Sequence, residues 1–343
     1  MRYHFLLWHI GRGISSILNT KKRIGGNKLQ LSSNTNRPTK PRLGVTARTV
    51  FSDWQLYLLI VLPLLYFITF KYVPMLGVVV AFKDYNVFKG IWASDWIGLE
   101  AFREIFQMDA FIDALRNTFV LNLLDLIVGF PVPIILALLL NEIRVKWFKR
   151  SAQTLLYLPH FISWVVIGGM ATQLLATNSG SVNIFLNSLG IESIPFLSEN
   201  KHWVVTYLGT GIWREAGWGT ILYLAALTGI NKELYEAAEV DGATRLRKMW
   251  HITLPGIKPT IVILLILNVG HMATIGFDRP FLLGNPGVSD VSEVISTYVY
   301  TVGIQSERYT IATAIGLFQS IIGLIFLFSA DYISRKVNNQ GIW

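Results

Sequence analysis

The sequence has no cysteine and little charge. Cysteine is absent from all 343 residues, and only 15% of the residues are charged. The missing thiols exclude a disulfide framework, thiolate metal sites, cysteine nucleophiles and thiol redox chemistry. Soluble domains carry roughly 25% charged residues, because charge covers a water-facing surface. With 52% hydrophobic residues and a mean hydropathy of +0.46, this chain cannot solvate its own exterior. Lipid is therefore expected to be the solvent for much of it.

Several catalytic motifs are missing as well. No G-x-x-x-x-G-K-[ST] run occurs, so the chain has no loop of that type to hold nucleotide phosphates. It also has no HExxH motif and no serine elbow. The six histidines show no ligand spacing, and His160, His251 and His271 are interpreted as packing or pathway residues. We expect no catalytic residue, no metal and no cofactor on this chain.

Long apolar runs predict an all-α polytopic membrane protein. A helix needs ~20 apolar residues to cross about 30 Å of hydrocarbon. Six runs have this length, at 54–76, 117–140, 153–176, 203–228, 260–283 and 309–330. Six crossings place both termini on the same side of the membrane.

The distribution of Lys and Arg predicts the orientation. The side that holds both termini and the loops 142–152 and 229–259 has 21 of these residues, against 8 on the other side. The 8 include Lys71 and Arg279. When only the last 20 residues of the N-terminal tail are counted, the ratio is still 15 to 8. Because basic residues accumulate in cytoplasmic loops, both termini are predicted to be cytoplasmic.

The N-terminal tail forms a region of its own. Residues 1–53 contain a short apolar stretch, without a small-residue cleavage site after it, and then the basic, turn-rich run at 21–42. This composition is typical of a disordered segment that lies near anionic headgroups. We interpret 1–53 as a cytoplasmic tail and not as a cleaved signal peptide.

The cytoplasmic loop 229–259 is long and is predicted to form two helices. Asn231 can cap the first helix, and Asp241-Gly242 can end it, since glycine adopts the left-handed C-cap conformation easily. The second helix is predicted to stop at Leu254-Pro255, and Pro259 suits the first turn of the next span. Such an element can transmit force from a soluble partner. The alternative is a helical hairpin that lies flat on the membrane.

This loop resembles the EAA signature of binding-protein-dependent ABC import permeases. Glu236-Ala237-Ala238, Gly242 and Ile252-x-Leu254-Pro255 reproduce its spacing. Further segments are similar to the subfamily that imports complex oligosaccharides, including alginate and pectin fragments: FPVPIILALLLNE (130–142), WREAGWGTILYLAAL (213–227), WHITLPGIKPTIVILLIL (250–267) and the closing Gly341-Ile342-Trp343. The similarity covers about residues 50–343.

The resemblance implies a type I ABC importer transmembrane domain in the bacterial inner membrane. A first helix and outward loop, 54–111, would precede a core, 112–331, and a C-terminal tail, 332–343. The expected partners are a second homologous permease chain, two cytoplasmic ATPase subunits that carry ATP and Mg, an extracytoplasmic solute-binding protein, membrane lipid and an oligosaccharide, and not nucleic acid. The resemblance assigns coupling to the ATPase to Glu236, Ala237, Ala238, Asp241, Gly242, Ile252, Leu254 and Pro255.

Polar and aromatic residues inside the spans are candidates for the transport pathway. Ionisable side chains are expensive in lipid and usually face a cavity or a partner. The candidates are Asp125, Trp213, Arg214, Glu215, Trp218, Asn268 and His271. Arg214 and Glu215 project about 100° apart on a helix, so each is expected to pair with another element. The glycines at 209, 211, 217 and 219 are expected to loosen the fourth span at a transport site. Alternatively, these charges and glycines hold helices together.

Two other classes of protein are weighed against an importer subunit. A membrane-embedded polysaccharide-processing enzyme should show paired acidic residues beside a large loop, and none is evident. A secondary sugar carrier normally has more than six spans and would not need the loop at 229–259. The outward segment 83–116, which contains Tyr85, Phe88, Trp92 and Trp96, is either a docking surface for the solute-binding protein or a cap over the bundle.

Overall fold

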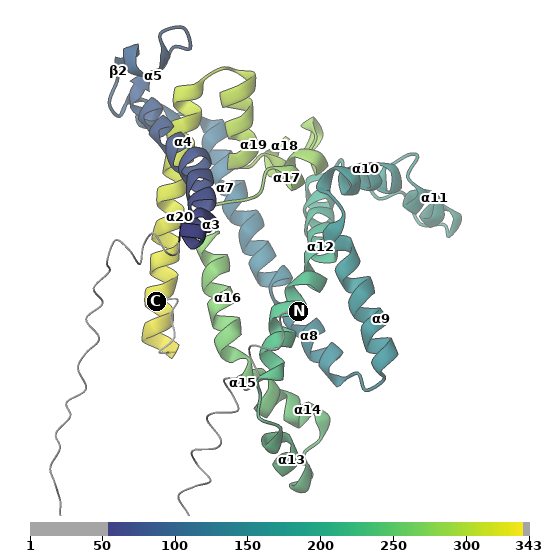
Figure 1. The fold of residues 1–343 in the computed structure, drawn as a ribbon. Coiled ribbons are helices and arrows are strands. Elements are labelled where there is room, and N and C mark those ends of the chain that lie inside the picture. Colours follow the sequence, from purple (N-terminus) through teal and green to yellow (C-terminus); the bar gives the residue numbers. More distant parts are fainter. Residues whose placement is uncertain (1–53, 339–343) are drawn as a thin grey trace, which may run out of the picture. The chain divides into compact units, whose positions relative to one another are not determined.

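The computed structural model describes residues 54–338 (Figure 1). The predicted tail 1–53 and the last five residues of the predicted C-terminal tail lie outside the described residues. The chain divides into two units, 1–63 and 64–343. Of the first unit, only the beginning of one helix is described. The hydrophobic clusters and cavities found in the described residues belong to the second unit.

The described chain is almost entirely helical, with η denoting a 3₁₀ or π helix. Up to residue 142 the elements are α3 (Trp54–Phe67), η1 (Ile68–Tyr72), α4 (Val73–Met75), η2 (Leu76–Phe82), β1 (Lys83–Asp84), α5 (Gly90–Ala93), β2 (Asp95–Trp96), α6 (Glu100–Ile105), α7 (Asp109–Leu124), η3 (Asp125–Gly129) and α8 (Pro131–Glu142).

The remaining elements complete the bundle. They are α9 (Lys146–Tyr157), η4 (Leu158–Phe161), α10 (Trp164–Leu175), α11 (Ser181–Ser188), α12 (Asn200–Thr228), α13 (Lys232–Val240), α14 (Arg245–Lys248), η5 (Met249–Thr253), α15 (Leu254–Gly256), α16 (Lys258–Gly270), α17 (Asp278–Leu283), η6 (Pro286–Val288), α18 (Ser289–Ser292), α19 (Ile295–Tyr300), η7 (Thr301–Gln305) and α20 (Tyr309–Asn338).

Within residues 54–338, three stretches of helix are long and apolar enough to cross a membrane. They are Tyr57–Phe82, Asp109–Glu142 and Tyr309–Lys336, and they contain most or all of the predicted first, second and sixth spans. Two bent helix pairs raise the number of candidate spans to five if each pair is one span. The predicted fourth span corresponds to α12, a continuous helix of 29 residues.

The predicted third span, 153–176, is wrong as a single helix. The chain bends by 97° between Lys146–Phe161 and Trp164–Leu175. Pro159 lies in the 3₁₀ turn η4, and the Ser163 hydroxyl accepts a hydrogen bond from the Val166 N–H to cap α10. Because proline removes a helical donor and a capping serine starts a new helix, the sequence breaks the span here.

The predicted fifth span, 260–283, is also wrong in extent. Helix α16 ends at Gly270, and a turn closed by the hydrogen bond from Thr274 N–H to the His271 carbonyl follows. Gly270 packs against Leu327 of α20, and an added Cβ would lie 2.6 Å from Leu327 Cδ1. A separate short helix, α17, then begins at Asp278. Residues 271–283 therefore form a turn and a second helix instead of continuing the span.

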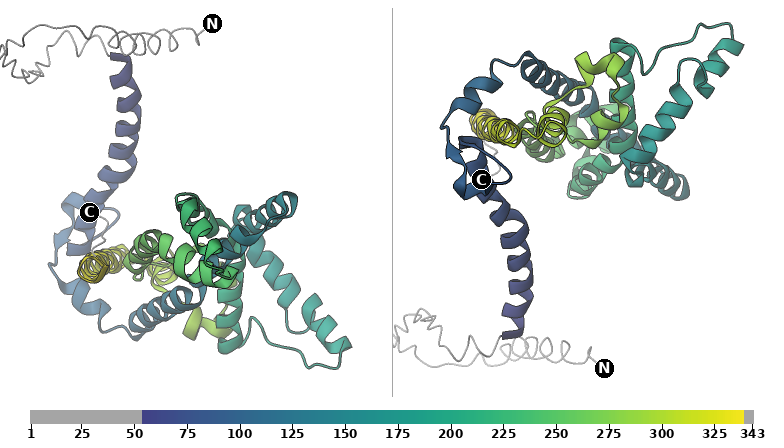
Figure 2. Two further views of the ribbon diagram at one scale, coloured as in Figure 1. Left: turned by 90° about the horizontal axis from the view of Figure 1, so that it is seen from below. Right: turned by 90° about the horizontal axis from the view of Figure 1, so that it is seen from above.

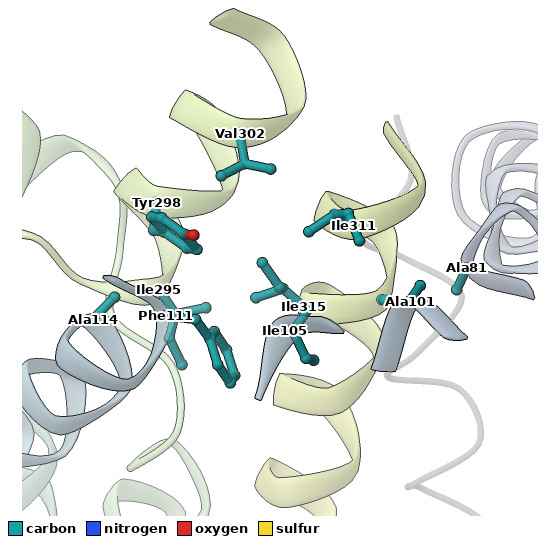
Figure 3. Packing of buried hydrophobic residues seen from close by; sticks show 11 residues of the cluster. Ala81, Ala101, Ile105, Phe111, Ala114, Ile295, Tyr298, Val302, Ile311 and Ile315 are labelled. Carbon is teal, nitrogen blue, oxygen red and sulfur yellow. The ribbon is translucent and has the colours of Figure 1, made fainter. Parts of the chain in front are cut away.

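One hydrophobic cluster joins the ends of α7 and α20 (Figure 3). Phe111 and Ile315 are fully buried in it, together with Ile105 of α6 and Ile295 of α19. Seen in Figure 3, side chains from these separate helices point toward one another. Close packing of this kind stabilises through many small van der Waals contacts between the side chains. The cluster fixes α6, α7, α19 and α20 at one end of the bundle.

Two further clusters surround α12. Near its beginning, Trp203 and Tyr207 pack with Leu283 of α17, and the indole Nε1 of Trp203 donates a hydrogen bond of 2.8 Å to the Leu283 carbonyl. Near its end, Tyr223 and Leu227 pack with residues of α8 and with the fully buried Ile257. Helix α12 is thus held at both ends by different neighbours.

The two ends of the bundle carry different elements. Helices α13 and α14 project from one end, and the β1–β2 hairpin lies at the other (Figure 1). Seen along the helix axes, α16 and α20 lie side by side, while α10 and α11 extend away from them (Figure 2). The long loop at 229–259 therefore stands at the end of the helices instead of between them.

Glycines let neighbouring helices approach α12 closely, and they do not break it. A Cβ added at Gly217 would overlap the Leu156 carbonyl of α9, and one at Gly219 would lie 3.0 Å from Pro133 of α8. Around Gly209 there is open space within 4 Å. The expectation that the glycines loosen this span is wrong, since α12 continues through all four. Gly217 and Gly219 serve the alternative role, close helix packing.

Exchanging glycine for alanine should separate these roles. Gly217→Ala places a methyl group against the backbone of α9, so we expect a loss of roughly 1–3 kcal/mol of stability or more. Gly209→Ala, on the same helix, should be neutral or slightly stabilising. The thermal midpoint of the purified protein in detergent measures both variants. Equal midpoints would contradict the packing role of Gly217.

Candidate transport cavity and coupling loop

A cavity of about 340 Å³ lies among η3, α8, α12 and α16. Four of the predicted pathway residues line it: Asp125, Glu215, Trp218 and Asn268. A neighbouring cavity of about 260 Å³ shares Asp125 and Glu215 with it and adds Trp164 and residues of the turn after α16. The structure thus brings together side chains from three predicted spans.

An ion pair forms part of the wall of both cavities. The Arg279 guanidinium of α17 donates to the Asp125 carboxylate at 2.8 Å, and the two side chains are 13% and 31% exposed. Arg279 also donates to the Tyr207 carbonyl and stacks 3.6 Å from the Tyr207 ring centre. Because an added Cβ at Gly211 would overlap the guanidinium, that glycine provides the space for it. Arg279 therefore joins α17, α12 and η3.

A π-helical turn presents Asp125. The Phe130 N–H donates to the Asp125 carbonyl at 3.0 Å, five residues back, directly before Pro131 of α8. Proline lacks the N–H that a regular helix would use, and π turns within helices are frequent at functional sites. The turn widens the helix at the residue that faces the cavity.

Arg214 and Glu215 pair with each other, contrary to the prediction. The Arg214 guanidinium donates to the Glu215 carboxylate. Each also reaches another element, as expected: Arg214 Nε donates to the Ile162 carbonyl at 3.0 Å, and Glu215 Oε2 lies 2.9 Å from His160 Nδ1. Long side chains can bridge neighbouring helical positions when both are drawn to the same side, here the bend between α9 and α10.

Trp218 has one face covered and lines the cavity. The His160 ring stacks on it with ring centres 4.4 Å apart and planes at 4°. The Phe161 ring also contacts the indole edge-on, with ring centres 5.8 Å apart, so two neighbouring rings hold its orientation. Trp213 is about half exposed, and neither it nor His271, at the turn after α16, lines either cavity.

Two residues of this site were missed or placed in another role by sequence reasoning. Arg279 was counted with the outer loop, and His160 was interpreted without a partner. A signal for Arg279 existed, because Asp278 and Arg279 interrupt the apolar run predicted as 260–283. Because ionisable residues within a predicted span usually face a cavity or a partner, Arg279 could have been included among the pathway candidates.

The loop after α12 forms the two predicted helices with the predicted caps. The Asn231 side chain accepts from the Glu233 N–H at 3.0 Å to start α13, and Gly242 has a φ of +71° at its end. Thr244 caps α14. The predicted stop at Leu254-Pro255 is wrong by a short stretch, since the helix continues through the π turn η5 and α15 to Gly256. Pro259 lies in the first turn of α16, as predicted.

Two side-chain contacts hold the two helices of this loop together. The Tyr235 hydroxyl of α13 lies 2.9 Å from the hydroxyl of the buried Thr253, and Lys248 Nζ donates to Glu239 Oε1 at 2.6 Å. The hydrogen bond and charge of Lys248 lower the pKa of the Glu239 carboxyl. The carboxylate therefore stays ionised, and the ion pair is lost only when the pH falls through that lowered pKa.

The outer surface of the loop is exposed. Glu236, Ala237, Asp241 and Pro255 are exposed, and so are the apolar Leu234, Val240 and Leu246; Ala238, Ile252 and Leu254 are partly buried. Exposed apolar side chains on a helix that projects from a bundle are a common feature of surfaces that bind another molecule. The predicted coupling residues thus lie together on one loop, most of them open to a partner.

Fold and site together define a helical membrane transport subunit: apolar helices surround a cavity whose largely apolar wall carries the Asp125–Arg279 ion pair, and a two-helix loop extends from one end. Residues 129–339 match the family of binding-protein-dependent transport system inner membrane components, and the chain belongs to this family. It is an inner membrane permease of an ABC importer.

Similar proteins agree with this assignment. The chain is 45% identical to "Protein LplB" of Bacillus subtilis (strain 168) over 291 residues, 85% of this chain and 92% of that protein. It is 47% identical to the "Polygalacturonan/rhamnogalacturonan transport system permease protein YteP" of the same strain, over 84% of this chain and 90% of that one.

A solved structure gives the fold. The crystal structure of a bacterial alginate ABC transporter in complex with an alginate pentasaccharide-bound periplasmic protein contains a chain that matches with a TM-score of 0.78 and 40% identity. The match covers 86% of this chain and 99% of that one. The predicted type I ABC importer permease fold is thereby confirmed.

Removing both charges of the cavity pair should cost less stability than the two single removals added together. Arg279→Gln or Asp125→Asn leaves the other charge unpaired in a largely buried place, and we expect each to lower stability by about 3 kcal/mol. The double variant should lose less than the sum. Thermal midpoints give the comparison, with the exposed Lys201→Gln as control. Additive losses would show that the pair does not interact.

Proposed function

We propose that this chain is the membrane subunit of an ATP-driven importer of oligosaccharides, with the loop Gly229–Pro259 coupled to a separate ATPase. The observation that carries the proposal is the geometry of that loop. Its EAA-type residues lie on two capped and braced helices at one end of the bundle, with an apolar surface left exposed. The membership in an importer permease family supports it.

The proposed topology has six crossings with both termini in the cytoplasm. Besides the three candidate spans, the proposed crossings are α9 with η4, α12, and α16. The 97° bend would turn α10 along the membrane surface. The excess of Lys and Arg in the loops at 142–152 and 229–259 supports this orientation, because basic loops remain in the cytoplasm.

The cavity is proposed to contact the cargo. Trp218 offers a flat face that His160 holds in place, and pyranose rings present C–H groups that pack on such faces. Asn268, Asp125 and Arg279 supply hydrogen-bonding groups on the same wall. The names of YteP and of the alginate transporter support an oligosaccharide cargo. Trp213 and His271 would act outside this cavity.

The coupling loop is proposed to move as a rigid body. Force applied to Glu236 or its neighbours on α13 would pass through the Tyr235–Thr253 contact to η5. From there Ile257 leads into the cluster that holds the ends of α8 and α12. Helix α12 carries Glu215 and Trp218 of the cavity, so a rotation at its end would change the cavity.

The remaining parts of the importer would be other chains. A second permease would complete the pathway, and the exposed apolar side chains of α10 and α11, such as Val165 and Phe185, suit such a neighbour. Two ATPase subunits would carry ATP and Mg, with no cofactor on this chain. A solute-binding protein would deliver the sugar; the alginate transporter structure contains a periplasmic protein bound to an alginate pentasaccharide, which supports this part of the proposal.

A reconstituted transporter tests the proposal. We expect Glu236→Lys to abolish ATP-dependent uptake of sugar into proteoliposomes, because the charge at the ATPase contact is reversed. A transporter with Glu192→Lys, a change at an exposed glutamate outside the loop 229–259, should transport sugar normally. Uptake that continues without the ATPase would indicate a secondary carrier, and chemical conversion of the sugar would indicate an enzyme.

Loosening the loop should uncouple ATP hydrolysis from transport. Tyr235→Phe removes only the hydroxyl that contacts Thr253, so we expect the ATPase to bind and hydrolyse ATP while several-fold less sugar is moved per ATP. Thr253→Val should do the same, and the double variant should be no worse than either. Tyr332→Phe, at an exposed tyrosine, is the control. An unchanged ratio of sugar to ATP would contradict the rigid-loop proposal.

A further inference from the structure

The hairpin between η2 and α6 exposes several large apolar side chains. Strands β1 and β2 pair antiparallel, with Lys83 opposite Trp96, and α5 lies in the connection. Val87 is 58% exposed, Phe88 100%, Trp92 80% and Trp96 68%. Exposed apolar residues gathered on so short a segment usually mark a contact with another molecule or with a membrane.

The backbone under these rings is firmly held. The buried Lys83 amine donates to the carbonyls of Trp92 and Ser94, both at 3.1 Å. The Ser94 hydroxyl accepts from the Asn86 N–H at 3.1 Å and donates to the Gly90 carbonyl at 2.7 Å. Hydrogen bonds of a buried charged amine are strong, so the hairpin keeps one shape. The exposure of the rings is a property of a structured element.

The hairpin lies where two apolar helices end. The candidate span that ends at Phe82 leads directly into it, and the other begins at Tyr309. The Thr310 hydroxyl donates to the Lys83 carbonyl at 2.8 Å and accepts from the Tyr85 N–H at 3.1 Å, which ties the hairpin to the start of α20. It is at the opposite end of the bundle from α13 (Figure 1). Its depth is therefore that of a membrane–water boundary.

We propose that this hairpin is a membrane-interface anchor, with Phe88, Trp92 and Trp96 inserted between the headgroups and acyl chains of one leaflet. On the chain the hairpin follows a helical stretch whose apolar side chains are also exposed, among them Val73, Met75 and Leu76. Aromatic rings prefer this depth, and the amphipathic indole most of all. The Lys89–Asp95 ion pair, at 3.0 Å, offsets both of its charges beside the rings.

The anchor would fix the depth and tilt of the helices that flank it. Thr310 links the hairpin directly to α20, and α20 packs against α16, which lines the cavity through Asn268. Under the proposed topology, the leaflet that contains the hairpin is the outer one. The insertion itself does not depend on that topology.

Spin labels provide the test, because the chain contains no cysteine of its own. Phe88→Cys, Trp92→Cys and Trp96→Cys are each labelled in the assembled transporter in lipid nanodiscs. The collision rates with oxygen, which partitions into lipid, and with a water-soluble nickel chelate are measured. Leu324→Cys on α20 is the lipid reference, and Glu192→Cys is the water reference.

We expect all three hairpin labels to favour oxygen over nickel several-fold, like the label at 324. Nickel rates as high as those at 192 would overturn the proposal. Low rates for both reagents would also overturn it and would assign the hairpin to a protein partner, the solute-binding protein if protection appears only when that protein is added. Phe88→Cys removes a fully exposed ring, so loss of folding is not expected there.

A second measurement needs no label at these positions. Lipids brominated along the acyl chain quench tryptophan fluorescence on contact. Subtracting the emission of the Trp92→Phe/Trp96→Phe variant from that of the unmodified chain gives the emission of these two tryptophans. We expect this emission to be quenched most by bromine atoms near the headgroup. An unquenched difference would contradict insertion. Neither measurement uses ATP or sugar, so a failed uptake experiment would leave this result unaffected.

Discussion

The structure depends on how closely other elements approach α12. Gly217 admits the backbone of α9, Gly219 admits Pro133, and Gly211 admits the guanidinium of Arg279. In lipid, helices gain little from hydrophobic burial against each other, so close packing and polar contacts hold them together. Helix α12 makes both kinds of contact. The stretch of α12 that contains these glycines also forms part of the cavity wall.

Two acidic residues within the apolar bundle are paired with residues of opposite charge. Asp125 is paired with Arg279 and Glu215 with Arg214, so the acidic groups of the cavity wall have cationic neighbours. A charge left unpaired in such a place is costly. The Asp125–Arg279 pair also links elements far apart in the sequence, since its residues are separated by 154 positions. Polar residues thus connect the helices whose relative movement the proposed function requires.

The features predicted from local sequence were the most successful. The cap at Asn231, the glycine turn at Gly242 and the start of α16 at Pro259 each depend on a few adjacent residues, and the structure has them. Long apolar runs likewise predicted the second and sixth spans. The bend after Pro159 was missed, because hydropathy continues unchanged through it. The Arg279 pair was missed because its partner lies on another helix, and one sequence does not reveal distant contacts.

The braced loop at the end of α12 has a consequence for assembly. Its two helices are already capped and tied by the Tyr235–Thr253 and Lys248–Glu239 contacts. A segment that must fold when it binds loses conformational entropy at that moment, whereas a preorganised one loses little. Under the proposed function, the permease would present to its ATPase a loop that is already folded before the two subunits bind. The two subunits could then stay joined while the ATPase opens and closes, with the binding free energy spent on holding the contact instead of ordering it.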